Sequence, residues 1–267
     1  MSISTLDQYV ASAKQRLPWI KTVSRTSVAV MPFSVFDIAG NPGAGVLPIG
    51  NTANGVVHTN SGVAGYPVFS TFGGGAKGYL SKVEFGSTVA CRITMYDRIF
   101  SAGAYAFNAN VILAAQPVYT SRIPGGTDYK GLEIWVEQVT LATLNQAVTV
   151  TYTKEDGVTG GRTTGAVGIG AAPTVGRMWR LPLQSGDCGV SKIESVLGTV
   201  ASAGTFNVHV MRPLWMGRVP SIGSGDNHDF LKTGLVEVFQ NTCLFPVITA
   251  DSTATGIPEM NIEICNA

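Results

Sequence analysis

Three acidic or imidazole side chains lie close together late in the chain, in the run SGDNHDF. Asp226, His228 and Asp229 form the one cluster whose residue types resemble a set of metal ligands. A structural zinc site requires about four ligands at set spacing, commonly including cysteine, and neither condition is met. We therefore interpret the run as a solvated loop that could contact a partner through Asp226 and His228. A hard cation such as Ca²⁺ is the alternative ligand, and we predict neither a metal site nor a cofactor.

An aromatic side chain lies between two glutamates in GLEIWVEQ, residues 131–138. Glu133, Trp135 and Glu137 alternate with apolar residues, so they share the exposed face of a predicted strand. The two carboxylates would lie about 13 Å apart along this strand, outside the range of about 5 to 9.5 Å used in glycoside hydrolysis. Trp135 could stack on a sugar ring, or its face could pack under a loop or against a neighbouring subunit.

Other catalytic patterns are missing or occur in the wrong context. Gly73, Gly75 and Gly78 form GxGxxG, but the residues that follow alternate as a strand, whereas a dinucleotide site needs a helix N-terminus. No GxSxG or HExxH is present. His58 and His209 have no carboxylate nearby in the sequence, and His209 falls on the polar face of a strand, which predicts a surface position. We predict no catalytic residue and no enzymatic activity.

The four cysteines are far apart and show no CxxC pair. Cys91 alternates in phase with Ile93 and Met95, so we expect it to act as a small buried hydrophobe. We therefore expect free thiols, as in a protein assembled in a reducing cytoplasm. For Cys188, which lies in a predicted loop, the sequence leaves open whether the thiol is free or forms a disulfide.

The composition is poor in charge. Charged residues make up 13% of the 267 residues, about half the roughly 25% of ordinary soluble domains, and the net charge is +1. The 18 lysines and arginines are scattered singly, whereas nucleic-acid binding needs clustered cations. No run approaches the roughly 20 apolar residues that cross a bilayer. We expect no nucleic acid and no membrane as partners, and a neutral surface suited to contact with other subunits; an ordinary neutral β-protein is the alternative.

The first residues predict a short helix. Ser4 followed by Asp7 resembles a capping box, and apolar residues then fall on one helical stripe until Pro18. This stripe contains Leu6, Tyr9, Val10, Ala13 and Leu17. Because so short a helix is unstable alone, we expect residues 1–20 to form an arm that docks on its own body or on a neighbour, with Leu6, Tyr9 and Val10 as candidate contacts.

From residue 21 onward the apolar period is two. Residues 91–96, 132–137 and 148–153 alternate cleanly, which predicts antiparallel sheets with one buried face. Many short strands separated by turn residues predict an all-β protein built from β-sandwiches of the jelly-roll or immunoglobulin-like sort. The run 39–67, rich in glycine, asparagine and proline, predicts a long loop that could embrace another subunit.

A repeat divides the body in two. GYLSKVEFGSTVACRITMYDRIF, residues 78–100, reappears in degenerate form as GVSKIESVLGTVASAGTFNVHVMRPLW, residues 189–215, and GLEIWVEQ is echoed by GLVEVFQ from Gly234. Such self-similarity suggests a duplicated unit. We predict two tandem antiparallel β-sandwiches, residues 21–157 and 158–267, behind the arm; one continuous sandwich is the alternative.

Several stretches resemble a family of tailed-bacteriophage virion structural proteins of the capsid decoration or auxiliary type. They are spread over nearly the whole chain: MSISTLDQYVASAKQR, MPFSVFDIAGNPGAG, residues 78–100, IPGGTDYKGLEIWVE, TYTKEDGVTGGRTTG and LPLQSGDCGVSKIESV. The resemblance implies a virion component encoded among head and packaging genes and assembled in the host bacterial cytoplasm. It implies the major capsid protein or other virion proteins as partners, and no catalytic residues.

These observations together predict a capsid decoration or cement protein that bridges neighbouring capsid subunits, and we expect a homo-oligomer. A cement adds binding free energy at every symmetry-related site of the shell. The alternatives are a tail or head-to-tail adaptor component, and a glycan-binding host-adhesion module with Trp135 and Asp226 among its contacts.

Overall fold

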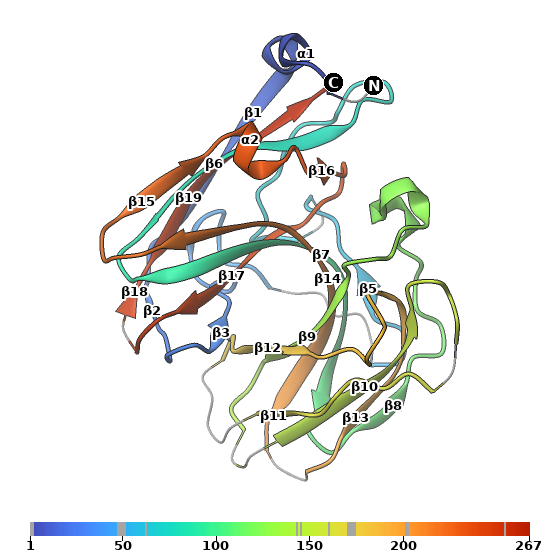
Figure 1. The fold of residues 1–267 in the computed structure, drawn as a ribbon. Helices are drawn as coiled ribbons and strands as arrows, with labels where there is room; N and C mark the ends of the chain where they lie inside the picture. The colour runs from blue at the N-terminus through green and yellow to red at the C-terminus, as the bar shows by residue number, and fades with distance from the viewer. Residues whose placement is uncertain are drawn as a thin grey trace.

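The structure is a computed structural model, which describes residues 3–46, 52–61, 63–142, 144, 146–159, 161–169, 175–200, 203–253 and 255–267. Nearly all of its regular elements are antiparallel strands, which confirms the predicted all-β fold class. Three larger sheets, called here the central sheet and the first and second outer sheets, make up the body. Figure 1 shows the first outer sheet over one half of the central sheet and the second over the other half.

The central sheet is organised around two long strands. β7 (Cys91–Ala106) has 16 residues and β14 (Thr205–Val219) has 15, and the two pair with each other in the middle of the sheet. Beyond β14 lie β9 (Glu133–Gln138) and β12 (Met178–Leu181); beyond β7 lie β17 (Leu244–Ala250) and β3 (Pro32–Phe33), and β5 (Val56–Val57) also pairs with β7.

The two outer sheets are smaller. The first runs β15 (Gly225–His228), β6 (Gly78–Ser87), β19 (Pro258–Asn266), β1 (Ala13–Lys21) and β4 (Gly40–Asn41), with β16 (Glu237–Val238) also on β6. The second runs β11 (Val167–Ile169), β10 (Gln146–Lys154), β13 (Val190–Gly198) and β8 (Asn110–Ile112). The remaining elements are the pair β2 (Arg25–Thr26) and β18 (Thr255–Gly256), helices α1 (Leu6–Ala11) and α2 (Phe230–Thr233), and 3₁₀ turns at Thr120–Arg122 and Pro124–Gly126.

Each outer sheet encloses a hydrophobic core with its half of the central sheet. Cys91, Ile93 and Met95 of β7 point into the first core, as their alternation predicts. Ile134 and Val136 of β9 point into the second core, where they meet the inward residues of β10 and β13. The period-two pattern therefore identified the buried face of these strands.

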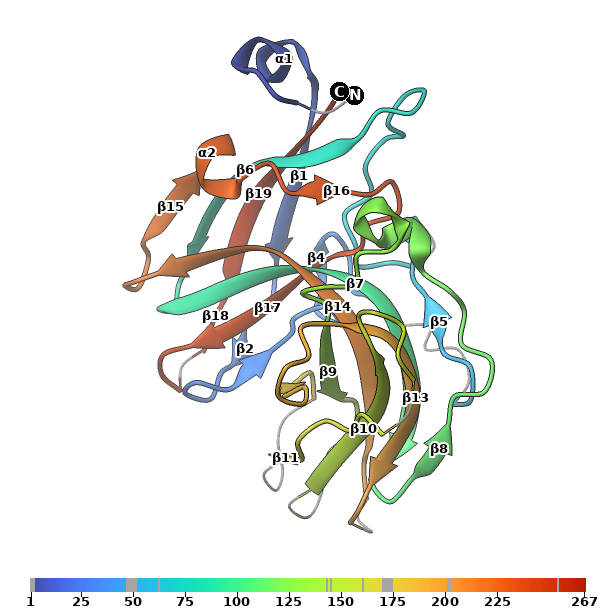
Figure 2. The same cartoon turned by 45° about the vertical axis from the view of Figure 1, so that its right-hand side comes forward.

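The boundary at residue 157 does not separate the two sandwiches. The first outer sheet takes β6 from residues 21–157 and β19 from residues 158–267, and the second takes β10 and β13 from opposite sides of the boundary. The physical reason is that β7 and β14 are each long enough to run through both sandwiches and pair along their length. Figure 2 shows these two strands bending from one sandwich into the other.

The strand order nevertheless reads the same outward from either side of the β7–β14 pair. In the central sheet, β9 and β12 lie beyond β14, and β17 and β3 lie in the same way beyond β7. In the outer sheets, β13 is flanked by β8 and β10, and β6 is flanked by β15 and β19. The matched words SKVE and SKIE fall on β6 and β13, which take equivalent places. This topology supports the hypothesis of a duplicated unit. The third repeated word departs from it, since GLEIWVEQ forms β9 while GLVEVFQ spans β16, and β9 corresponds to β17.

The N-terminal helix is shorter than the stripe of apolar residues predicts. Thr5, not Ser4, is the N-cap, with Gln8 completing the capping box, and the helix ends at Ala11. β1 begins at Ala13, so Leu17 and Pro18 belong to a strand. Burial of alternate β1 residues and pairing with β19 outweigh the helical pattern here. Pro18 is tolerated because β4 pairs with β1 only at the end of the strand.

The cysteines yield a first testable prediction. Cys188 is exposed, whereas Cys91, Cys243 and Cys265 are buried and free, which confirms Cys91 as a buried hydrophobe. The hydrogen bond and charge of the nearby Glu155 carboxylate raise the pKa of Cys188, and burial raises the pKa of the other three. We expect Ellman's reagent to titrate one thiol slowly in the native protein and all four after denaturation. Rapid reaction of several thiols without denaturant would contradict the described burial.

Candidate functional site

The run SGDNHDF forms an edge strand, which corrects the predicted loop. In β15, Asp226 lies opposite Phe85 and His228 opposite Val83 of β6. This close pairing depends on Gly225, because a Cβ there would lie 2.6 Å from the Phe85 carbonyl oxygen. Asp229 caps α2 by accepting backbone N–H groups, so its carboxylate is engaged by the helix backbone.

Asp226 and His228 remain close to each other. His228 Nε2 lies 3.3 Å from Asp226 Oδ2, and Lys232 Nζ lies 3.5 Å from the same oxygen. His228 Nδ1 accepts a hydrogen bond from Trp215 Nε1 at 2.9 Å, which fixes the ring against the core. Over the described ranges, no group of three or more His, Cys, Asp or Glu side chains converges as metal ligands would.

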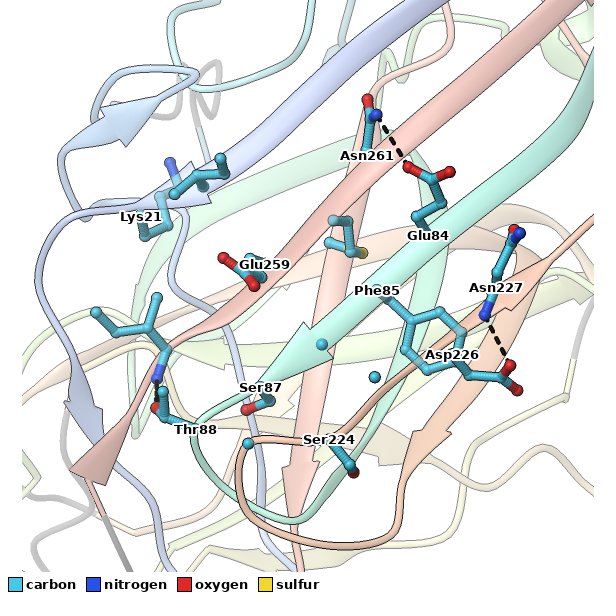
Figure 3. Close-up of a pocket in the computed structure, with 16 residues that line it drawn as sticks. Lys21, Glu84, Phe85, Ser87, Thr88, Ser224, Asp226, Asn227, Glu259 and Asn261 are labelled. Atoms are coloured by element: carbon cyan, nitrogen blue, oxygen red, sulfur yellow. Dashed lines mark hydrogen bonds between the residues drawn. The ribbon is translucent and has the colours of Figure 1, made fainter.

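An open groove of about 770 Å³ lies on the outward face of the first outer sheet, beside Asp226. It exists because Gly86 and Gly225 face each other across β6 and β15 and leave no side chain between them. Glu259 of β19 lies opposite Gly86 on the other side. Figure 3 shows the polar side chains that line this groove on three neighbouring strands.

The neighbouring row of the groove carries Asn261, Glu84 and Asn227, directly opposite one another on β19, β6 and β15. Asn261 Nδ2 donates to Glu84 Oε2 at 3.2 Å, and Lys82 forms an ion pair with the same carboxylate. The Lys82 and Asn261 hydrogen bonds lower the pKa of Glu84. Carboxylates and carboxamides of this kind bind hydroxyl or amino groups, so the groove could hold a polar ligand.

The buried Lys21 side chain lines one end of this groove but does not neutralise the negative charge of the groove carboxylates. Lys21 Nζ donates to the carbonyl oxygens of Pro42 and Gly43 at 3.0 and 3.2 Å. Burial lowers the pKa of Lys21 to about 8. The ammonium group is therefore held by backbone carbonyls rather than presented to a ligand.

Trp135 lies on the outward face of β9, but this face is covered, so its predicted exposure is wrong. Only 5% of the residue is exposed, and it packs in a third cluster with Phe36 and Tyr66 from the segments that follow β3 and β5. Trp135 Nε1 donates to Glu133 Oε2 at 2.9 Å. Of the predicted alternatives, packing of the Trp135 face under a loop is confirmed.

A chain of buried hydrogen bonds crosses the covered part of the central sheet. The Ser101 hydroxyl lies 2.7 Å from His58 Nε2 and 2.6 Å from His209 Nδ1. His209 Nε2 lies 3.0 Å from Glu137 Oε2, and Ser34 Oγ donates to Glu137 Oε1 at 3.1 Å. All five side chains are buried. The predicted surface position of His209 and exposed position of Glu137 are wrong, because the segments after β3 and β5 fold over this face.

The geometry assigns the protons of this chain. Ionised Glu137 only accepts hydrogen bonds, so neutral His209 donates through Nε2 and accepts from Ser101 at Nδ1. Ser101 in turn accepts from His58 Nε2, which leaves the buried Nδ1 of His58 without a proton, and this Nδ1 has no hydrogen-bond partner among the described residues. Burial lowers the pKa of both histidines, and the Arg98 guanidinium lowers them further.

The carboxylate at the end of the chain is held in its charged form. Burial alone would raise the pKa of Glu137, but the His209 hydrogen bond, the Arg98 charge and the Ser34 hydrogen bond lower it to about 2. Arg98 itself is buried between aromatic rings, with its guanidinium carbon 3.8 Å from the centre of the Phe245 ring.

Ser101, His209 and Glu137 have the residue types of a catalytic triad. A catalytic serine must be reachable by a substrate, yet Ser101 has 0% exposure and its hydroxyl is held by two imidazoles. In this conformation the three side chains stabilise the covered face of the sheet and do not face a substrate.

A buried ion-pair cluster lies between the two hydrophobic cores. Asp97 of β7 follows the last inward residue of the first core and precedes Ile99 of the second. It forms an ion pair with Arg122, and it accepts hydrogen bonds from Thr242 Oγ1 at 3.2 Å and Cys243 N at 3.0 Å. The sequence signal for this cluster was an adjacent pair of charges, Asp97 and Arg98, inside a long apolar strand.

Comparisons with known proteins give little guidance. No protein-family model and no curated protein matches the chain. A solved structure of infectious bursal disease virus, Gx strain, is 8% identical, with 96% of this chain and 80% of that chain covered and a TM-score of 0.20. The Gt strain structure is 9% identical, with 96% of this chain and 81% of that chain covered and a TM-score of 0.18. The VP2 subviral particle of infectious bursal disease virus is 8% identical, with 95% of this chain and 80% of that chain covered and a TM-score of 0.17. Such low TM-scores do not indicate a shared fold.

The remaining predicted contact residues, Leu6, Tyr9 and Val10, lie on α1 at one end of the molecule. α1 buries none of its six residues, and Leu6 and Val10 are 60% and 67% exposed. The Tyr9 ring packs at a tilt against Phe230 of α2, with ring centres 4.5 Å apart, so the arm lies on its own body. Leu231 of α2 is also exposed, and Figures 1 and 2 show α1 beside the chain termini with α2 below it. Within the described residues, no helix is long and apolar enough to span a bilayer.

Proposed function

We propose that this protein is a non-enzymatic structural protein of a tailed-bacteriophage virion, and that it decorates the capsid by bridging neighbouring subunits. The family resemblance of the sequence supports the virion assignment. The structural observation on which the proposal rests is the arm, whose Tyr9 holds it to the body while Leu6 and Val10 face outward. A helix that exposes its apolar residues at i and i+4 is suited to insertion into a partner's surface.

A second surface supports docking on other proteins. The outward face of the second outer sheet carries two rows across its strands, and none of the side chains in them is charged: Asn110, Leu197 and Thr149 in one row, Ile112, Ser195 and Thr151 in the other. Ile112 is 71% exposed. Interface centres are depleted in charge, so this face can be covered by another subunit without burying an unpaired ion.

The arm residues test the proposal. We expect Leu6→Asp/Val10→Asp to fold normally, because both side chains are exposed in the free protein, and to bind purified empty shells about a hundredfold more weakly. Co-sedimentation with shells measures this. Val118→Asp, at another exposed apolar position, is the matched control and should bind as the wild type does. Equal binding of the arm variant and the control would contradict a docking role for the arm, and wild-type protein that ignores shells would refute the proposal.

A second candidate function is glycan binding in the groove of the first outer sheet. The Glu259 carboxylate, which forms no ion pair among the described residues, and the Asn261 and Asn227 side chains favour a hydroxyl-rich ligand there. A glycan array separates the two functions, because a cement binds shells and ignores sugars. Co-sedimentation with purified tails in place of shells tests the other alternative, because a head-to-tail adaptor or tail component would bind tails.

A further inference from the structure

A second hollow lies on the part of the central sheet that the covering segments leave open. It encloses about 650 Å³ and extends across the strands from Arg180 on β12 to Pro32 on β3. Its middle is formed by Thr94 of β7, which lies opposite Met216 of β14 on one side and Val247 of β17 on the other. This hollow is called here the central-sheet groove.

The residue types of the central-sheet groove are those enriched at protein interfaces. Trp135, Tyr96, Met216, Arg92 and Arg180 all line it, and tryptophan, tyrosine, methionine and arginine are over-represented at binding surfaces. Met216 is 58% exposed although it lies in the middle of a sheet face. A flexible methionine in this position adapts to an apolar side chain of a partner.

One carboxylate holds the end of the groove in place. Glu133 accepts hydrogen bonds from Trp135 Nε1 at 2.9 Å and from the Tyr96 hydroxyl at 3.1 Å. Its other oxygen accepts from Arg180 Nη1 at 2.9 Å. Glu133 is therefore a positioning residue: the aromatic rings and one arginine are already fixed before any partner arrives, which reduces the entropy lost on binding.

The charges of the groove are not balanced. Arg180 shares Glu133, but Arg92 has no carboxylate within ion-pair distance among the described residues. Arg218, opposite Arg92 on β14, is paired with Asp251 at 3.5 Å. The groove therefore has one carboxylate for two guanidinium groups, and an arginine without a partner is suited to bind a carboxylate.

The shape of the aromatic side chains favours a peptide over a sugar. Trp135 and Tyr96 are each only 5% exposed, so neither offers a free ring face for stacking on a pyranose. The other groove residues are mostly apolar, including Pro32, Pro213 and Val247. Apolar contacts beside an unpaired guanidinium fit an extended chain whose aliphatic side chains flank a carboxylate.

We propose that the central-sheet groove binds an extended acidic segment of a partner protein, with Arg92 holding an aspartate or glutamate and Met216 packing against a neighbouring apolar side chain. The proposal rests on the proposed function, since it names the chemistry of the partner segment that such a structural protein would contact. It assigns Trp135 a role as a fixed wall of the groove rather than as a sugar-stacking residue.

A displayed library of random twelve-residue peptides is the probe. We expect selection on the wild type, with counter-selection on Arg92→Gln, to enrich peptides that carry Asp or Glu beside aliphatic residues. A synthetic copy of the best peptide should bind Arg92→Gln about 10- to 100-fold more weakly. Arg16→Gln, an exposed arginine on the first outer sheet paired with Glu263, is the matched control and should bind as the wild type does.

Three results would overturn the proposal: enriched peptides without acidic residues, peptides that bind Arg92→Gln as tightly as the wild type, or no enrichment at all. Arg92 is exposed, so its variant should keep the wild-type melting temperature and a loss of binding cannot be assigned to unfolding. Binding of uronate-containing glycans that Arg92→Gln abolishes would replace the peptide with a sugar. Wild-type protein that binds shells but selects no acidic peptide would refute the groove assignment alone, and the converse would refute the decoration role alone.

Discussion

Replacing Asp97 with alanine is expected to destabilise the protein by about 3–5 kcal/mol, because it leaves a buried guanidinium without its counter-charge. Arg122 is almost fully buried, and its Nη1 donates to the His58 carbonyl oxygen at 2.7 Å, so it cannot turn to solvent. The substitution also removes the acceptor of the hydrogen bonds that the Thr242 hydroxyl and the Cys243 backbone N–H donate to Asp97. Chemical denaturation measures the change in the free energy of unfolding.

Asp251→Ala is the matched control for Asp97→Ala. Asp251 forms its ion pair with Arg218 on the surface, and exposed pairs contribute little to stability. We therefore expect no measurable change in the free energy of unfolding for this variant. A loss for Asp97→Ala as small as that of the control would show that the Asp97 cluster does not stabilise the junction between the two cores.

The free energy of unfolding is expected to fall as the pH drops from about 6.5 to 5. Buried His58 and His209 have lowered pKa values in the folded protein, so the unfolded chain binds more protons in this window. Their contribution is complete above the unfolded pKa and is lost on acidification, by about 1.4 kcal/mol per pH unit for each histidine. The groups facing them are Glu137, Arg98 and Arg122.

The pH window separates the histidines from the carboxylates. Glu137 has its pKa lowered to about 2, so its contribution is present above its unfolded value and is lost only below about pH 4.5. Salt is the control, because screening weakens surface charges but not buried groups. Denaturation at several pH values in low and high salt measures the slope. A slope that disappears in high salt, or a flat profile between pH 5 and 6.5, would contradict the neutral buried chain.

The sequence predicted the sheets better than the surfaces. Alternation identified Ile93, Met95, Ile134 and Val136 as buried, because the period of a strand reports its own inward face. It could not report that the outward face of β9 is also covered, since the covering residues Phe36 and Tyr66 lie in irregular segments far away in the chain. Trp135, Glu137 and His209 were therefore placed on the surface.

The pairing of the two halves was also beyond sequence reasoning. Each copy of the repeat contains two successive strands, β6 and β7 in the first copy and β13 and β14 in the second. The repeated residues do not indicate that β7 pairs with β14, or that the central sheet belongs to both sandwiches. Asp97 and Arg122 are separated by 25 residues, and their contact joins β7 to an irregular turn, which has no periodic pattern in the sequence. The arm was predicted from Leu6, Tyr9 and Val10, and its exposed side is what the docking proposal uses.

The proposed virion role predicts that a phage encodes this chain, and imaging the particles of that phage, together with mass spectrometry of the same particles, tests it most directly. The decoration role predicts that the polypeptide is present and that a two-lobed density of its size repeats over the capsid lattice, with α1 at the contact to the shell. Particles that lack the polypeptide, or density confined to a single vertex or the tail, would contradict it.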